Sequence, residues 1–296
     1  MKTDIDEALD WLGEPVLCET CAHLERKGSR CQPLKACVHD RYARRVDRFF
    51  DWNADLAQGY LKHPYFEVRA CAAKAADVFH LPPLLDDPEE AVRWSAARRL
   101  PNRFLLKLRA DPHREVRIRV AQRLDGADLM PMIDDQDYLV RQHVARKLSP
   151  DLLVLMIGDP DVEVRRVVAA RIAPEQLGRL ASDPEAMVRL EAARRLEPAG
   201  LLRLCADPDW RVRHEIALRA DLDVVRGLVD DEDPLVRDAA RERLLGRACE
   251  PGRGAGAAAG FRVIAPSAWP AEPAPAAHRQ DGRGQSQERP AAEESR

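Results

Sequence analysis

The sequence predicts an all-α solenoid of eight 24-residue units, preceded by a small cysteine-rich module and followed by a tail. One observation is a Val-Arg pair that recurs every 24 residues, without a slip, from Val68 to Val236. Another is a group of four cysteines within twenty residues, upstream of the array. A fixed period of this length is typical of a solenoid, in which each unit buries its apolar face against its neighbours.

The first half of the pattern predicts one amphipathic helix per unit. With each Val taken as position 0, positions +4 and +8 are apolar in all eight units, and position +5 is Ala in seven. These positions share one helical face. Position −5 is Asp in seven units and position −4 is Pro in six. We therefore expect Asp as the N-cap, Pro as the first helical residue, and a helix of about twelve residues.

The second half of each unit is too short for another full helix. Positions −11 and −8 are apolar in all eight units, and this spacing suits a short 3₁₀ segment or a single helical turn. HEAT and TPR repeats, by contrast, need about 34 to 47 residues for their helices. The sequence thus predicts alternating long helices and short, tight ones.

Two basic columns accompany the apolar ones. Position +1 is Arg in all eight units, and position +7 is Arg or Lys in seven. We interpret both as structural: Arg at +1 would pair with acids between units, and the +7 cation would neutralise a helix C-terminus. The alternative is a nucleic-acid-binding stripe. The net charge of −3 does not favour that alternative, nor does the absence of any recurring aromatic column for base stacking.

The candidate metal site consists of Cys18, Cys21, Cys31 and Cys37, in a C-x₂-C-x₉-C-x₅-C spacing. Four thiolates are what an iron–sulfur cluster or a Cys₄ zinc site requires. Structural zinc sites usually have two closely spaced cysteine pairs, whereas here the second pair, Cys31 and Cys37, is separated by five residues. This spacing favours an iron–sulfur cluster, and zinc remains the alternative. His23 and His39 are further potential ligands.

We expect a cytoplasmic protein that is neither membrane-bound nor an enzyme. The N-terminus is acidic and shows no signal peptide, and no apolar run approaches the length of a membrane span. Seven cysteines in a reducing compartment indicate metal binding rather than disulfides. No Walker A loop, HExxH motif or Ser-His-Asp pattern is present.

The predicted domains are a metal module over residues 1–52, the repeat array over residues 53–248, and a tail over residues 249–296. The tail is rich in Pro, Ala, Gln and Glu and has few large apolar residues, so we expect it to be disordered. We also expect the cysteine module to cover the first repeat, since terminal repeats need a cap.

The cysteine head, followed by DPxxxVRxxAAxRL units, resembles the leucine-rich repeat variant family over about residues 1–248. That resemblance implies an N-terminal [4Fe–4S] module joined to a right-handed superhelix of alternating α- and 3₁₀-helices. It also implies that Cys18, Cys21, Cys31 and Cys37 are the cluster ligands. Members of this family occur in nitrogen-fixing bacteria alongside fixation functions.

The leading hypothesis is therefore a non-enzymatic iron–sulfur protein whose solenoid binds an unknown protein partner. The [4Fe–4S] cluster would act as a structural staple, a redox sensor or an electron carrier. The alternatives are a nucleic-acid-binding solenoid that uses the Arg columns, and a zinc-stapled scaffold with no redox role.

Overall fold

The computed structural model describes residues 7–246. They lie within one compact unit, Met1–Cys249. Over this range the chain forms helices and a few isolated β-bridges but no extended strand, which confirms the predicted all-α repeat fold. The tail predicted over residues 249–296 lies outside the described residues. Between residues 7 and 246, no helix is both long and apolar enough to cross a bilayer.

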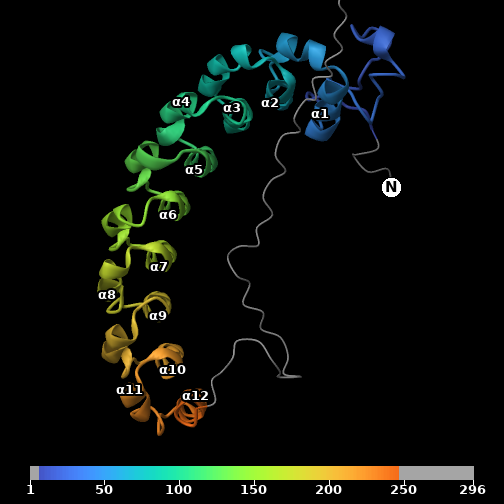
Figure 1. Ribbon diagram of the computed structural model, residues 1–296. Helices are drawn as coiled ribbons and strands as arrows, with labels where there is room; N and C mark the ends of the chain where they lie inside the picture. Colours follow the sequence, from blue (N-terminus) through green and yellow to red (C-terminus); the bar gives the residue numbers. More distant parts are fainter. Residues whose placement is uncertain (1–6, 247–296) are drawn as a thin grey trace, which may run out of the picture. The chain divides into compact units, whose positions relative to one another are not determined.

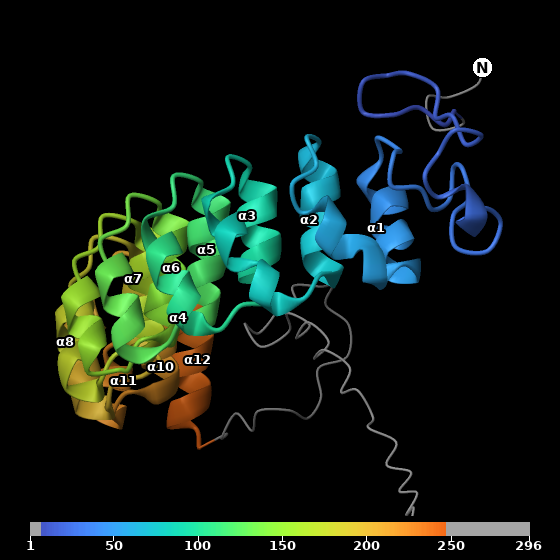
Figure 2. The ribbon, with the colours of Figure 1, turned by 90° about the horizontal axis from the view of Figure 1, so that it is seen from above.

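Each repeat contributes one main helix, and consecutive main helices pack side by side (Figure 1). Figure 2 shows the same row from above, beginning with the preceding helix α1 (Ala43–Trp52). The main helices are α2 (Phe66–Ala75), α3 (Glu90–Ala97), α5 (Arg114–Arg123), α6 (Tyr138–Lys147), α7 (Val162–Arg171), α9 (Ala186–Ala193), α10 (Trp210–Arg219) and α12 (Pro234–Leu244).

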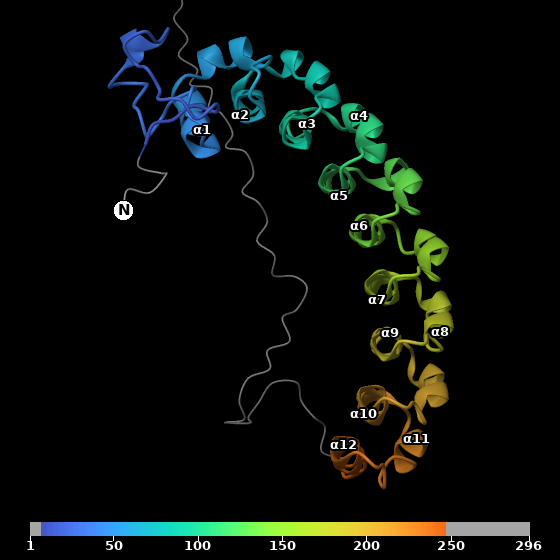
Figure 3. The same cartoon turned by 180° about the vertical axis from the view of Figure 1, so that it is seen from behind.

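Short segments form a second row along the array (Figure 3). As predicted, each is a 3₁₀ segment or a brief helical turn. Five units use 3₁₀ geometry alone, and the other three contain a short α-helix. In chain order they are η3 (Ala54–Tyr60), η4 (Val78–His80) with η5 (Pro82–Asp86), α4 (Asn102–Leu105) with η6 (Leu106–Ala110), η7 (Gly126–Met132), η8 (Leu152–Met156), η9 (Pro174–Gln176) with α8 (Leu177–Leu180), η10 (Pro198–Leu204) and α11 (Leu222–Arg226).

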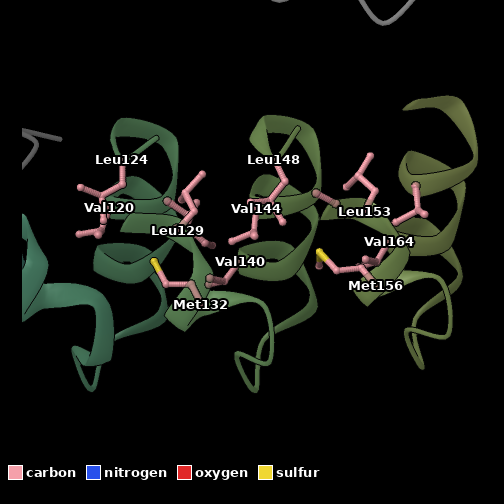
Figure 4. Packing of buried hydrophobic residues seen from close by; sticks show 14 of the residues in the cluster. Val120, Leu124, Leu129, Met132, Val140, Val144, Leu148, Leu153, Met156 and Val164 are labelled. Atoms are coloured by element: carbon pink, nitrogen blue, oxygen red, sulfur yellow. The ribbon is translucent and has the colours of Figure 1, made fainter. Parts of the chain in front are cut away.

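The apolar columns form one continuous core between the two rows. All eight Val residues at position 0 are at most 1% exposed, and the side chains at +4 are fully buried. Figure 4 shows how the short segment fits between helices: Leu129 and Met132 lie among Val120 of one main helix and Val140 and Val144 of the next. Each unit therefore completes its core only when both neighbours are present.

The predicted N-cap is wrong by two residues. The main helices begin at position −2, so the residue at −3 is the N-cap, as when Asp137 accepts a hydrogen bond from the backbone N–H of Leu139 at 2.9 Å. The Asp-Pro pair lies in the turn before the helix, and the helices are eight to eleven residues long rather than about twelve. The carboxylate at −5 makes other bonds. In Asp135 it accepts a hydrogen bond from the backbone N–H of Asp137 at 2.8 Å and pairs with Arg117 of the preceding unit.

That pairing recurs along the array. In one example, Arg141 donates from Nε and Nη2 to both carboxylate oxygens of Asp159, at 2.8 and 2.9 Å, and from Nη1 to the carbonyl of Asp135 at 2.7 Å. Both side chains are buried. Such bidentate pairs are directional and strong, so they fix the spacing of neighbouring units. We call the seven pairs the Arg-Asp clasps: Arg69–Asp87, Arg93–Asp111, Arg117–Asp135, Arg141–Asp159, Arg165–Asp183, Arg189–Asp207 and Arg213–Asp231.

The +7 column is also structural. Its arginines donate to carbonyls at the C-terminal end of the preceding main helix: Arg195 reaches the carbonyl of Ala169 at 2.9 Å, and Arg219 that of Leu196 at 2.9 Å. These carbonyls lack partners within their own helix, and the cation also complements the helix dipole. The arginines of both columns thus form ion pairs or hydrogen bonds within the protein. They no longer support a nucleic-acid-binding stripe.

The clasps predict a loss of stability in acid. Hydrogen bonds from Arg213 hold the pKa of Asp231 below its ordinary value, although burial acts in the opposite direction. A carboxyl whose pKa is lower in the folded state stabilises the fold above its unfolded pKa and loses that contribution as pH falls through the folded one. We expect the free energy of unfolding in urea to decrease below about pH 4. An unfolding free energy that stays constant from pH 7 to pH 3 would contradict this.

Candidate metal centre

The N-terminal module consists of loops followed by helix α1. Before α1, the only helical turn among the described residues is η2 (Leu24–Arg26). Isolated β-bridges connect parts of these loops, among them the bridges between Lys27 and Cys31 and between Gln32 and Ala36. Leu34, between the last two candidate ligands, has a left-handed φ of 63°. This conformation is unfavourable for a residue other than glycine, and such residues cluster in the loops of functional sites.

The structure places the four predicted ligands in one neighbourhood. Cys31 and Cys37 are buried, at 6% and 2% exposure, while Cys18 and Cys21 are half-buried. All four are free thiols. The sulfurs of Cys18, Cys21 and Cys37 each lie close enough to that of Cys31 to affect its pKa. Within residues 7–246, no three Cys, His, Asp or Glu side chains converge tightly enough to hold a single ion.

Burial is the main influence on the inner pair of thiols. It raises the pKa of Cys31, and the neighbouring Cys21 and Cys18 raise it further. Burial likewise raises the pKa of Cys37 to about 12. Such thiols ionise only when a strong positive charge compensates the thiolate, which is what metal ions supply. The donor set therefore fits a metal cluster.

Backbone N–H groups point at two of the sulfurs. The N–H of His23 donates to Cys21 Sγ at 3.4 Å, and the N–H groups of His39 and Asp40 donate to Cys37. Hydrogen bonds of this kind stabilise a thiolate and tune the potential of a bound cluster. The His23 ring, considered above as a substitute ligand, uses Nε2 to contact the Tyr60 hydroxyl.

Two buried polar residues that sequence reasoning missed hold the loops of the module to each other and to helix α1. Asn53, fully buried, donates to the carbonyls of Arg30 and Phe49 at 2.8 Å and accepts from Arg26 at 2.9 Å. Asp40, equally buried, accepts from Arg45 at 2.9 Å. Neither residue belongs to a repeat column. The one available signal was a polar residue beside the aromatic run of α1.

The module covers the first repeat, as predicted. Helix α1 packs on α2 and buries Phe49 and Phe50. The Tyr65 hydroxyl donates to the carbonyl of Arg41 at 2.9 Å, and Lys74 pairs with Asp47 at 2.8 Å. A change in the metal module is therefore expected to reach the first repeat.

Comparison with known proteins identifies both parts. A family model described as "LRV protein FeS4 cluster" matches residues 8–59, which include all four candidate ligands. A Rhodobacter capsulatus protein, described as "Uncharacterized 27.7 kDa protein in nifB 3'region", is 46% identical over 96 residues. That match covers 32% of this chain and 39% of the relative.

The array resembles a solved structure described as "a leucine-rich repeat variant with a novel repetitive protein structural motif". The identity is 42%, the TM-score is 0.73, and the match covers 77% of this chain and 98% of the other. The same chain thus carries the cluster module and the repeat fold on which the resemblance rested. This protein belongs to the leucine-rich repeat variant family.

Proposed function

We propose that Cys18, Cys21, Cys31 and Cys37 hold a [4Fe–4S] cluster and that the repeat array binds a protein partner. The observation that carries this proposal is that the iron–sulfur family model spans all four cysteines, whose thiols lie in one neighbourhood. The four free thiols suit a reducing compartment, so we place the protein in the cytoplasm.

Different residues around the thiols would contribute in different ways to holding such a cluster. A [4Fe–4S] cluster supplies one-electron chemistry when bound. The backbone N–H groups of His23, His39 and Asp40 would stabilise the thiolates of Cys21 and Cys37. Burial on the Cys31 and Cys37 side keeps water away, while half-exposed Cys18 and Cys21 leave the other side accessible to a redox partner. This asymmetry supports sensing or electron exchange over a purely structural role.

The relative whose description places it in the nifB 3' region supports a role alongside nitrogen fixation.

Spectroscopy of the reduced protein tests the redox role. We expect anaerobically purified protein to be coloured, to lose visible absorbance with dithionite, and to develop a paramagnetic signal that disappears on reoxidation. A colourless, diamagnetic protein that contains zinc would contradict the proposal and favour the zinc-stapled scaffold. As a control, the isolated metal-free protein should show neither change.

A further inference from the structure

A pocket of about 330 Å³ opens between α1, α2, α3 and α5, beside the metal module. Glu67, Trp94, Ser95 and Arg119 are among the residues that line it. They come from three consecutive repeats, so the pocket spans neighbouring units of the array.

The columns that line this pocket vary from unit to unit. Trp94 is at position +2, where the other units have Ala, Ile, Gln, Arg, Leu, His and Asp. By contrast, positions 0 and +1 are Val and Arg in every unit. Residues at +2 are buried in some units, such as Ile118 and Leu190, but their identity is not fixed by the repeat, so the residue at this position can differ where the surface binds a ligand.

Several polar groups in the pocket have no partner. Ser95 is only 7% exposed and lines the pocket, yet its hydroxyl makes no hydrogen bond with any described residue. The half-buried Glu67 carboxylate likewise has none in the described part of the chain, and burial raises its pKa. His113 Nδ1, also at the pocket, is buried without a partner between residues 7 and 246. The oxygens of Ser95 and Glu67 are therefore available to accept hydrogen bonds from a ligand in the pocket.

The charge and the aromatic ring indicate what kind of ligand fits. Three carboxylates line the pocket, those of Glu67, Glu90 and Glu115. The cation of Lys74 is paired with Asp47, which leaves Arg119 as the pocket's other cation. The guanidinium of Arg119 lies 4.9 Å from the centre of the Trp94 ring. The ring face thus already accepts one guanidinium, and the surrounding charge remains negative.

We propose that this pocket binds an arginine side chain of a partner polypeptide that lies across α2, α3 and α5. A guanidinium brings five donors and no acceptor, which matches the unpartnered oxygens of Ser95 and Glu67. Its charge complements the three glutamates. The inference deepens the partner-binding part of the proposed function and rests on that part alone, not on the cluster.

The test uses full-length protein labelled with ¹⁵N and two short peptides. One is acetyl-Gly-Ser-Arg-Gly-Ser-amide, and the other has neutral citrulline in place of arginine. The indole N–H signal of Trp94 is assigned from its disappearance in Trp94→Phe. We expect the arginine peptide to shift this signal in a saturable way and the citrulline peptide to leave it unchanged. We expect Glu67→Gln/Glu90→Gln to weaken binding by at least about tenfold.

Glu175→Gln is the matched control, because Glu175 is exposed in η9 and far along the chain from the pocket. A silent Trp94 signal, equal binding of the citrulline peptide, or unchanged affinity of the double variant would overturn the inference. Melting curves show whether each variant is folded. Iron and sulfide are measured on the same samples: a loaded cluster without peptide binding refutes the pocket alone, whereas peptide binding without a cluster refutes the iron–sulfur proposal alone.

Discussion

Replacing Arg141 with alanine is expected to destabilise the array by about 3–4 kcal/mol. The substitution removes both hydrogen bonds to the carboxylate of Asp159 and the bond to the carbonyl of Asp135. Asp159 then remains as a buried charge without its partner, and an uncompensated buried charge is more costly than the pair was favourable. Urea denaturation, monitored by circular dichroism, measures the change.

Two further variants separate the clasp from general effects of losing an arginine. Arg166→Ala removes a partly exposed pair with Glu163, on the same helix as the next clasp, and should cost about 0–1 kcal/mol. Arg141→Ala/Asp159→Ala removes both charges and should cost clearly less than the sum of the two single substitutions. Additive single effects would mean that the two side chains do not stabilise each other.

Replacing Cys31 with serine is expected to abolish metal binding and to loosen the N-terminal end of the array. Cys31 is buried, and the other three thiols surround it. A serine hydroxyl is a poor substitute for a thiolate ligand to iron. Because α1 packs on α2 and Tyr65 bonds to Arg41, the loosened module should expose the first repeat. Iron analysis and limited proteolysis followed by mass spectrometry test both parts.

The control for this variant is Cys205→Ser. Cys205 lies in the array, at the end of η10, and has no part in the proposed site. It should retain full iron content and the parental cleavage pattern. If Cys31→Ser kept its iron and its melting temperature, neither the ligand assignment nor the capping role would hold.

The repeat fold was predictable because the residue pattern of each helical element recurs in all eight units. Apolar columns at fixed spacings identified the main helix and the short segment, and both were confirmed. The predicted N-cap position was wrong because Asp followed by Pro usually signals the start of a helix. In this array the carboxylate at −5 instead pairs with an arginine 18 residues earlier in the chain, as Asp159 does with Arg141. Only the co-occurrence of the Asp and Arg columns hinted at that long-range pairing.

The candidate site was predictable only in part. Four cysteines in a short segment are conspicuous by chemistry alone. Asn53 and Asp40 are single polar residues whose importance lies in complete burial, which no local pattern reveals. The sequence shows no recurring aromatic column, and a single aromatic residue such as Trp94 gives no local signal that it lines a pocket.

The iron, acid-labile sulfide and zinc content of anaerobically purified protein tests most directly whether the cysteine module holds an iron–sulfur cluster. We expect about four iron and four sulfide per chain and no stoichiometric zinc. One zinc per chain with neither iron nor sulfide would contradict it, and would make the module a structural staple.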